Sequence, residues 1–319
     1  MWSKYPDILK ELNVVEEYIK KSIQSRNKLV SQVVNDLVGA GGKRLRPALA
    51  IICSGFGKGS NEKVTSIAGA LEILHSATLV HDDIIDRTRL RRGKPTVAEK
   101  YGVDMAVYTG DYLFTKAVLM LSKDIPVDKL KVVAKSVTTI CEGEVYQYQD
   151  RYNINTTVLS YLKRIRSKTA VLFGAACGLG AYGAECPEDI STRLSKFGVY
   201  YGMAFQIRDD LNDILSDSQK SGKPVLNDIS EGTITLPVIY ALKRSWELRD
   251  MVAKFAVKRT FLSPREAEEM ARLVKDCGGV KDAGVLLEKY IDKGLNVISS
   301  LPDISNRQML KDLISELRI

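Results

Sequence analysis

Two acidic motifs of the same form, DDxxD, lie far apart in the chain. The first runs from Asp82 to Asp86 and the second from Asp209 to Asp213. Each follows an apolar stretch with helical spacing, and on a helix residues four apart share one face. Carboxylates stacked in this way repel one another unless a cation lies between them. Mg²⁺ is the expected cation, because it is held by a few carboxylates together with substrate phosphates.

One DDxxD alone has an ordinary alternative explanation, as a solvated helix end or as acidic partners of surface lysines. Two copies, each at the end of an apolar helical stretch, are far rarer in a chain of ordinary composition. We therefore interpret the pair as metal-binding.

Basic residues stand close to the acidic motifs. Gly41-Gly42 is followed by Lys43, Arg44 and Arg46 just before an expected helix, where backbone amides and basic side chains make an anion site. A solvated basic turn is the alternative for this segment taken alone. The other residues that can bind phosphate are Arg91, Arg92, Lys168, Lys223 and His75. For the histidine, the alternative is an ordinary hydrogen-bonded polar side chain.

The composition is that of a globular protein with a sizeable core, with 45% hydrophobic and 27% charged residues. The net charge of +8 suits a polyphosphate substrate, anionic lipid or nucleic acid. Nucleic acid is disfavoured, because the basic residues are dispersed and no recognised binding motif occurs. Five cysteines without a CxxC pair indicate thiols in a reducing compartment. With neither a signal-peptide pattern nor an apolar stretch of spanning length, we expect a cytoplasmic protein without stable membrane insertion.

Apolar residues recur every three to four positions along nearly the whole chain, and no run alternates as a strand does. The pattern predicts an all-α fold, a single-domain bundle of about ten to thirteen helices around a central cavity. The predicted helices cover approximately 5–24, 28–39, 47–56, 62–86, 104–122, 128–150, 156–176, 188–216, 236–257, 265–277, 280–299 and 305–317. Because no linker interrupts them, one domain is expected over residues 1–319. Both acidic motifs would end long helices, where the helix dipole favours cations.

Further short motifs accompany the acidic ones in a fixed order. They are Gly42-Lys43-Arg44-Leu45-Arg46-Pro47, Leu79-Val80-His81 before the first DDxxD, Arg91-Arg92-Gly93, Gly110-Asp111-Tyr112-Leu113, Gly143-Glu144 with Gln147, Lys168-Thr169, Phe205-Gln206-Ile207-Arg208 before the second DDxxD, and Gly222-Lys223-Pro224 through Asn227-Asp228. In this order and spacing the chain resembles the trans-isoprenyl diphosphate synthases, the head-to-tail prenyltransferases that make farnesyl, geranylgeranyl and longer polyprenyl diphosphates. The resemblance covers nearly the whole length.

The resemblance implies a role for each matching residue. Asp82, Asp86 and Asp209 would hold Mg²⁺, three ions with substrate bound, with Asp213 as a further metal ligand and Asp83 and Asp210 in support. Arg91, Lys168 and Lys223 would bind the allylic diphosphate, and Lys43, Arg46, His75 and Arg92 the isopentenyl diphosphate. Thr169 and Gln206 would line the reacting centre. Thr233 stands where the family often has lysine, so one phosphate contact is missing or comes from another residue.

The implied reaction breaks the allylic carbon–oxygen bond, which leaves a carbocation and pyrophosphate. Mg²⁺ and cationic side chains stabilise the leaving group as its charge develops. The double bond of isopentenyl diphosphate then attacks the cation, and loss of a proton to the released pyrophosphate gives a product one isoprene unit longer. Water must be excluded, because it would quench the cation.

Product length should depend on the side chains one and two turns before Asp82, which are Leu74, Ala77 and Thr78. Short-chain members of the family typically close the tunnel here with a large side chain, whereas small residues leave it open. We therefore expect a geranylgeranyl or longer product, with a polyprenyl product favoured. The alternative is early closure by a bulky neighbour, such as Tyr108, Phe114 or Tyr146.

Two alternative functions remain open. A class I terpene cyclase shares the helical bundle and one DDxxD, but its second motif would carry Asn, Ser or Thr, and Glu at wider spacing, and it would lack the isopentenyl-binding cations. The other alternative is the catalytic subunit of a heteromeric synthase, because the chain keeps both acidic motifs. Homodimers are the norm in the family, and apolar helix faces within 104–150 are candidates for the interface.

Overall fold

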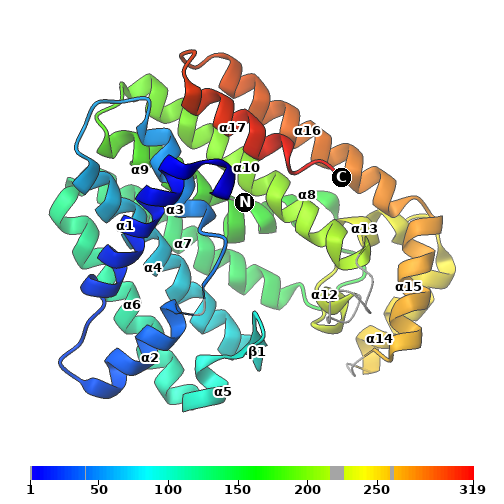
Figure 1. Ribbon diagram of the computed structural model, residues 1–319. Helices are drawn as coiled ribbons and strands as arrows, with labels where there is room; N and C mark the ends of the chain where they lie inside the picture. Colours follow the sequence, from blue (N-terminus) through cyan, green and yellow to red (C-terminus); the bar gives the residue numbers. More distant parts are fainter. Residues whose placement is uncertain (1, 40, 216–225, 259–261) are drawn as a thin grey trace. The chain divides into compact units, whose positions relative to one another are not determined.

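The computed structural model describes residues 2–39, 41–215, 226–258 and 262–319. Most of these residues are helical (Figure 1), which confirms the all-α prediction. Within these ranges the only sheet is an antiparallel hairpin of β1 (Leu90–Arg91) and β2 (Lys94–Pro95). Its turn residues Arg92 and Gly93 have φ of 55° and 75°, as a type I′ turn requires. Strands this short leave no alternating pattern, so the sequence did not predict them.

By its internal contacts the chain forms two compact units. Unit 1 comprises Met1–Ala134, Ala175–Ser195 and Leu301–Leu310, and unit 2 comprises Lys135–Gly174, Lys196–Ser300 and Lys311–Ile319. The helices α7 (Val127–Gln149), α9 (Val171–Gly183), α10 (Glu188–Leu215) and α17 (Ser305–Ser315) carry residues of both units. The single domain over 1–319 and its central cavity stay predictions.

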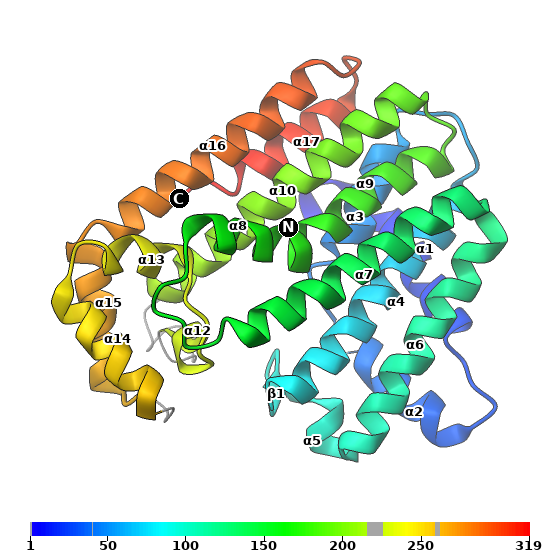
Figure 2. The same cartoon turned by 180° about the vertical axis from the view of Figure 1, so that it is seen from behind.

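Helix α4 (Asn61–Ile85) is the central helix of unit 1. It packs against α1 (Pro6–Ser22), α3 (Leu45–Ser54) and α6 (Val103–Asp124), as Figures 1 and 2 show. Its middle, residues 66–74, is buried all round, as expected of a helix that is apolar on every side. The other elements of this unit are η1 (Trp2–Lys4), α2 (Lys28–Val38), α5 (Val97–Tyr101) and the hairpin. The first acidic motif therefore ends a helix that is held on several sides.

Unit 2 contains α8 (Val158–Ile165), η2 (Arg166–Ala170), α12 (Asn227–Ser230), α13 (Leu236–Leu242), α14 (Trp246–Lys258), α15 (Pro264–Asp276) and α16 (Gly279–Ser299). The predicted helix 236–257 is instead two helices, because the Ser245 hydroxyl accepts a hydrogen bond from the Leu248 amide over 3.0 Å and starts α14. The predicted helix 156–176 is interrupted by η2, a single π-helical turn. Ser263 and Glu266 form a capping box at the start of α15.

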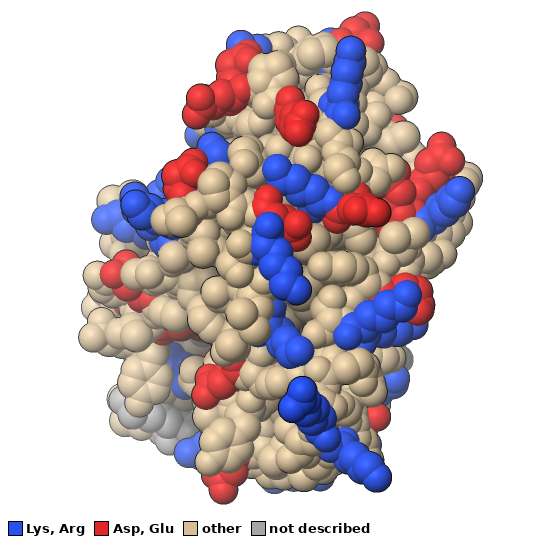
Figure 3. All heavy atoms as spheres, turned by 90° about the vertical axis from the view of Figure 1, so that its left-hand side faces the viewer, with Lys and Arg blue, Asp and Glu red and all other residues tan. Residues whose placement is uncertain are grey.

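No helix in the described ranges is long and apolar enough to cross a membrane. On the face drawn in Figure 3, Lys and Arg side chains are interspersed with Asp and Glu, and no large area carries one sign. Basic side chains gather instead around a cavity within unit 1.

Candidate active site

The first acidic motif occupies the end of α4. Asp82 and Asp86 are half-buried, whereas Asp83 between them is buried. The amide of Asp86 donates to the Asp82 carbonyl over 2.8 Å, so helical geometry continues through the motif. Asp82 and Asp86 therefore lie one turn apart on the same face, at the helix end whose dipole favours cations.

Asp83 is bound by the protein itself. Arg91, in β1, donates to Asp83 Oδ1 from Nε over 2.8 Å and from Nη2 over 2.7 Å. Burial raises the pKa of Asp83, and the positive charge of Arg91 opposes that rise. This charge-assisted pair fixes Arg91 next to the motif. Asp83 thus positions a residue that was predicted to bind diphosphate.

A cavity of about 280 Å³ in unit 1 brings predicted substrate-binding residues together. His75, Arg91 and Arg92 are among its lining residues. The glycine turn before Lys43 comes close to it, because a Cβ on Gly42 would lie 2.6 Å from Arg92 Nη1. Glycine at this position lets the basic loop approach the hairpin.

His75 faces several guanidinium groups across this cavity. Burial and the positive charges of Arg46, Arg92, Arg91 and Arg44 hold the pKa of His75 well below its usual range. A neutral imidazole can still donate one hydrogen bond. The surrounding positive charge favours an anion in the cavity. Arg46 therefore contributes to this field, although it and Lys43 lie outside the cavity lining.

The second acidic motif occupies the end of α10. Asp209 is exposed and Asp213 half-buried, whereas Asp210 is buried. Tyr161 donates its phenol to Asp210 Oδ2 over 2.6 Å, and Gln206 donates its amide to Oδ1 over 2.8 Å. Burial raises the pKa of Asp210 to about 6, against these two hydrogen bonds. The network fixes the motif from inside unit 2.

Lys168 and Thr169 lie on the π-helical turn η2, and such turns are frequent at functional sites. The ammonium of Lys168 is 3.0 Å from Glu144 Oε1 and 3.0 Å from Oε2. Thr169 donates its hydroxyl to Gln206 Oε1 over 2.8 Å. The structure thus brings together the predicted pair Thr169 and Gln206, and links them to the second acidic motif through Asp210.

The predicted chain-length residues lie on α4. Leu74 and Ala77 are buried, and the hydroxyl of Thr78 donates to the His75 carbonyl over 2.8 Å. The aromatic side chains that could have closed a tunnel early are Tyr108, Phe114 and Tyr146, which are 66%, 38% and 67% exposed. These aromatic side chains are therefore not buried where they would block a product tunnel.

Each acidic motif brings one pair of spaced carboxylates, Asp82 with Asp86 and Asp209 with Asp213. Among the described residues, no three His, Cys, Asp or Glu side chains gather into a metal cage. This donor set fits Mg²⁺, which is usually held by one or two carboxylates, with water and substrate phosphates as the remaining ligands.

Residues 27–274 match the sequence profile described as polyprenyl synthetase. The chain belongs to the polyprenyl synthetase family. Heptaprenyl diphosphate synthase component 2 of Geobacillus stearothermophilus is 37% identical over 311 residues, which are 97% of this chain and 95% of that protein. The crystal structure of heptaprenyl diphosphate synthase from Staphylococcus aureus matches with a TM-score of 0.91 at 34% identity, over 97% of each chain. Geranylgeranyl pyrophosphate synthase from Lactobacillus brevis matches with a TM-score of 0.91 at 31% identity, over 99% of this chain and 98% of that one.

This polyprenyl synthetase is therefore an enzyme, a prenyltransferase of the trans-isoprenyl diphosphate synthase family. Its two acidic motifs share a feature that the sequence did not reveal. The second aspartate of each, Asp83 or Asp210, is buried and bound by a protein side chain. Tyr161 was missed, because the partner of its hydroxyl, Asp210, lies on another helix. The predicted diphosphate-binding residue Lys223 lies outside the described residues.

Proposed function

We propose that the enzyme condenses isopentenyl diphosphate head-to-tail with an allylic diphosphate, and that its trans product is geranylgeranyl or longer, with a polyprenyl product favoured. One observation in unit 1 supports this most. The cavity that holds neutral His75 among guanidinium groups lies along the same helix as the carboxylate pair Asp82 and Asp86. The basic cavity could bind one diphosphate directly, and the carboxylate pair could bind the other through a metal ion.

Magnesium is the proposed cofactor, with three ions when substrate is bound. Asp82 and Asp86 at the end of α4, and Asp209 and Asp213 at the end of α10, would hold it. When bound, Mg²⁺ acts as a Lewis acid that stabilises the departing pyrophosphate.

Arg91 and Lys168, together with Lys223, would bind the allylic diphosphate. Arg91 already binds Asp83, but a guanidinium has five N–H donors in a fork and can hold a phosphate oxygen as well. An ammonium has three donors, so Lys168 can bind Glu144 and a phosphate oxygen together. These cations would stabilise negative charge as it develops on the leaving group.

Lys43, Arg46, His75 and Arg92 would bind isopentenyl diphosphate. His75 suits this role as a neutral donor within a positive field. Thr169 and Gln206 would hold the reacting centre through their mutual hydrogen bond, and the released pyrophosphate would take the proton. Two observations support an open product tunnel. Ala77 and Thr78 are small, and the aromatic side chains that could have blocked the tunnel are exposed.

A second candidate is the catalytic subunit of a heteromeric synthase. Its support is the name of one relative, heptaprenyl diphosphate synthase component 2, which marks that protein as part of an assembly. Homodimerisation is the simpler proposal, supported by exposed apolar side chains on α6 and α7.

The test incubates the purified chain with Mg²⁺, radiolabelled isopentenyl diphosphate and, in separate tubes, dimethylallyl, geranyl or farnesyl diphosphate. Products are dephosphorylated and sized by chromatography. A ladder that ends at one long polyprenol supports the proposal and gives the product length. A farnesyl product contradicts the proposed length, and no incorporation with any starter favours an obligate partner subunit.

A further inference from the structure

The loop that carries Lys43 and Arg46 has an unusual backbone. Arg44 has φ 49° and ψ 37°, the left-handed conformation, and it stands at the N-cap of α3. Gly41 also has a positive φ of 72°, but glycine adopts this without strain whereas arginine does not. A residue held in this region persists only when its surroundings fix it, and such residues cluster at functional sites.

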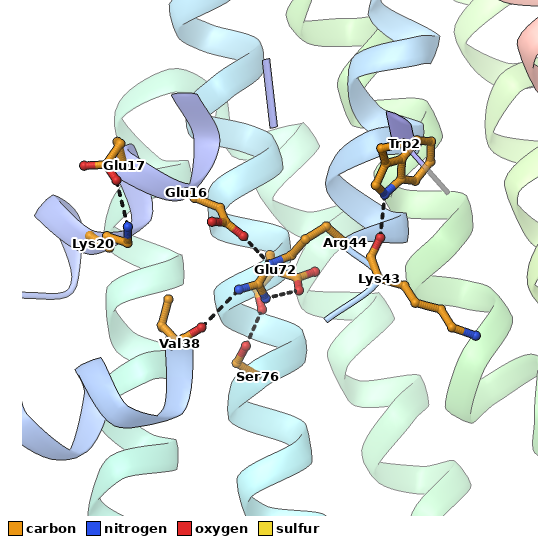
Figure 4. Close-up of polar contacts among 9 residues, drawn as sticks. All are labelled: Trp2, Glu16, Glu17, Lys20, Val38, Lys43, Arg44, Glu72 and Ser76. Atoms are coloured by element: carbon orange, nitrogen blue, oxygen red, sulfur yellow. Dashed lines mark hydrogen bonds and ion pairs between the residues drawn. The ribbon is translucent and has the colours of Figure 1, made fainter. Parts of the chain in front are cut away.

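The guanidinium of Arg44 is fixed by three elements of unit 1. Its Nε donates to Glu16 Oε1 of α1 over 3.0 Å, and its Nη1 donates to Glu72 Oε1 of α4 over 2.8 Å. Its Nη2 donates to the Val38 carbonyl at the end of α2 over 3.2 Å. The Arg44 side chain is therefore engaged within the protein, whereas Figure 4 shows the Lys43 side chain extending away from these partners.

The N-terminal segment holds the same loop at a second point. The indole Nε1 of Trp2, in η1, donates to the Lys43 carbonyl over 2.7 Å (Figure 4). Trp2 is buried, and the amide of Tyr5 donates to its carbonyl over 2.9 Å at the start of α1. Trp2 thus binds the backbone of Lys43, and Glu16 binds the side chain of the next residue, Arg44.

Glu72 also supplies negative charge to the basic cavity. It is buried and lines the cavity with Arg44, Arg91 and Arg92. Its charge favours the protonated guanidinium of Arg92, against the opposing effects of burial, Arg44 and Arg91. A carboxylate at the back of the cavity keeps the cations together when no phosphate is bound.

We propose that Trp2, Glu16, Arg44 and Glu72 are positioning residues for isopentenyl diphosphate. Trp2 and Glu16 hold the loop from η1 and α1, and Arg44 and Glu72 hold it in the lining of the cavity itself, so that Lys43 and Arg46 present their charges to the diphosphate. This proposal rests on the proposed function, and it gives η1 and α1 a part in substrate affinity that the sequence motifs did not indicate.

The test compares three conservative variants in the full chain. Trp2→Phe removes the indole N–H together with part of the buried ring, and Glu16→Gln weakens the hold on Arg44 while leaving the buried Glu72 pair. Glu17→Gln is the matched control, because Glu17 is the next residue of α1 and forms an exposed pair with Lys20 over 2.7 Å. Binding of isopentenyl diphosphate is measured by calorimetry, and KM is measured for each of the two substrates.

Loss of one positioning hydrogen bond should weaken isopentenyl diphosphate binding by about fivefold in W2F and in E16Q. The KM for the allylic substrate should stay at the wild-type value in both variants, the Tm should be unchanged in E16Q, and E17Q should match wild type throughout. Equal rises in both KM values with a lower Tm would indicate general damage to the fold and overturn the proposal, as would unchanged binding in both variants. If the wild-type chain itself binds no isopentenyl diphosphate, the proposed function fails instead.

Discussion

At the scale of residues, the aspartates of each motif divide between two roles. Asp83 and Asp210 are buried and bound by Arg91 and Tyr161, whereas the outer aspartates are half-buried or exposed. The sequence predicted that the aspartates of each motif lie at the end of a helix, because apolar periodicity and the motif spacing are enough for that. It could not identify their partners, because Tyr161 and Asp210 are brought together only by the packing of α8 against α10.

Tyr161→Phe should damage the second motif without changing its aspartates. Asp210 would lose the phenol donor, and leaving a buried acceptor without its hydrogen bond destabilises a fold by about 1–3 kcal/mol. The Tm in thermal unfolding should therefore fall, and the rate of isopentenyl incorporation should drop about tenfold. Tyr148→Phe is the control, because Tyr148 is 65% exposed. Wild-type Tm and rate in Y161F would contradict the positioning role of Tyr161.

His75 should remain neutral at pH values where an ordinary histidine is protonated. Because burial and four arginines lower its pKa in the folded state, the unfolded chain binds a proton first as pH falls below about 6.5. Stability should therefore be complete above that pH and decline below it. NMR titration of the two histidines, assigned with His75→Asn, measures this pKa, which isopentenyl diphosphate should raise. A titration of His75 at its usual pKa would contradict the described electrostatics.

At the scale of elements, long helices were predictable and their interruptions were not. The helices predicted at 62–86 and 188–216 are Asn61–Ile85 and Glu188–Leu215, because apolar periodicity and a preceding break define such elements well. The π-helical turn η2 has no comparable sequence pattern. It is packed against glycines, since a Cβ on Gly143 would lie 2.7 Å from Ser167 Cβ and one on Gly202 would lie 2.6 Å from Ala170 Cα.

Gly202→Ala should therefore destabilise the protein although alanine favours helices. The added methyl meets backbone that cannot move aside, so we expect a loss of about 1–3 kcal/mol in the free energy of unfolding. Gly284→Ala is the matched control in helix α16, where nothing lies within 4 Å of the new Cβ, and it should stabilise by about 0.5–1 kcal/mol. Denaturant titration measures the free energy of unfolding of each variant. Equal effects of the two substitutions would refute the close packing of η2.

At the scale of the whole molecule, the proposed assembly depends on one face of α6. Val103, Val107 and Phe114 recur at helical spacing, and all three are exposed. We propose this apolar stripe as the interface of the homodimer. The sequence predicted the region, 104–150, but the exposure of particular side chains required the packing of α6 against α4.

Val107→Asp should shift the proposed homodimer toward single chains, because a carboxylate would be buried in the interface without a partner. Val285→Asp is the control, on a similarly exposed valine of α16. Sedimentation velocity should give twice the single-chain mass for wild type and V285D, and less for V107D. A dimer that is unaffected by V107D would place the interface elsewhere.

The central claim is that the two acidic motifs support metal-dependent condensation of two diphosphates. It is tested most directly by incorporation of radiolabelled isopentenyl diphosphate into a farnesyl diphosphate starter, in wild type, Asp82→Asn, Asp209→Asn and the exposed control Asp128→Asn. We predict incorporation that requires Mg²⁺, is abolished by a chelator, falls at least about 100-fold in D82N and D209N, and is unchanged in D128N. Incorporation that persists without divalent metal, or at the wild-type rate in either motif variant, would contradict the account.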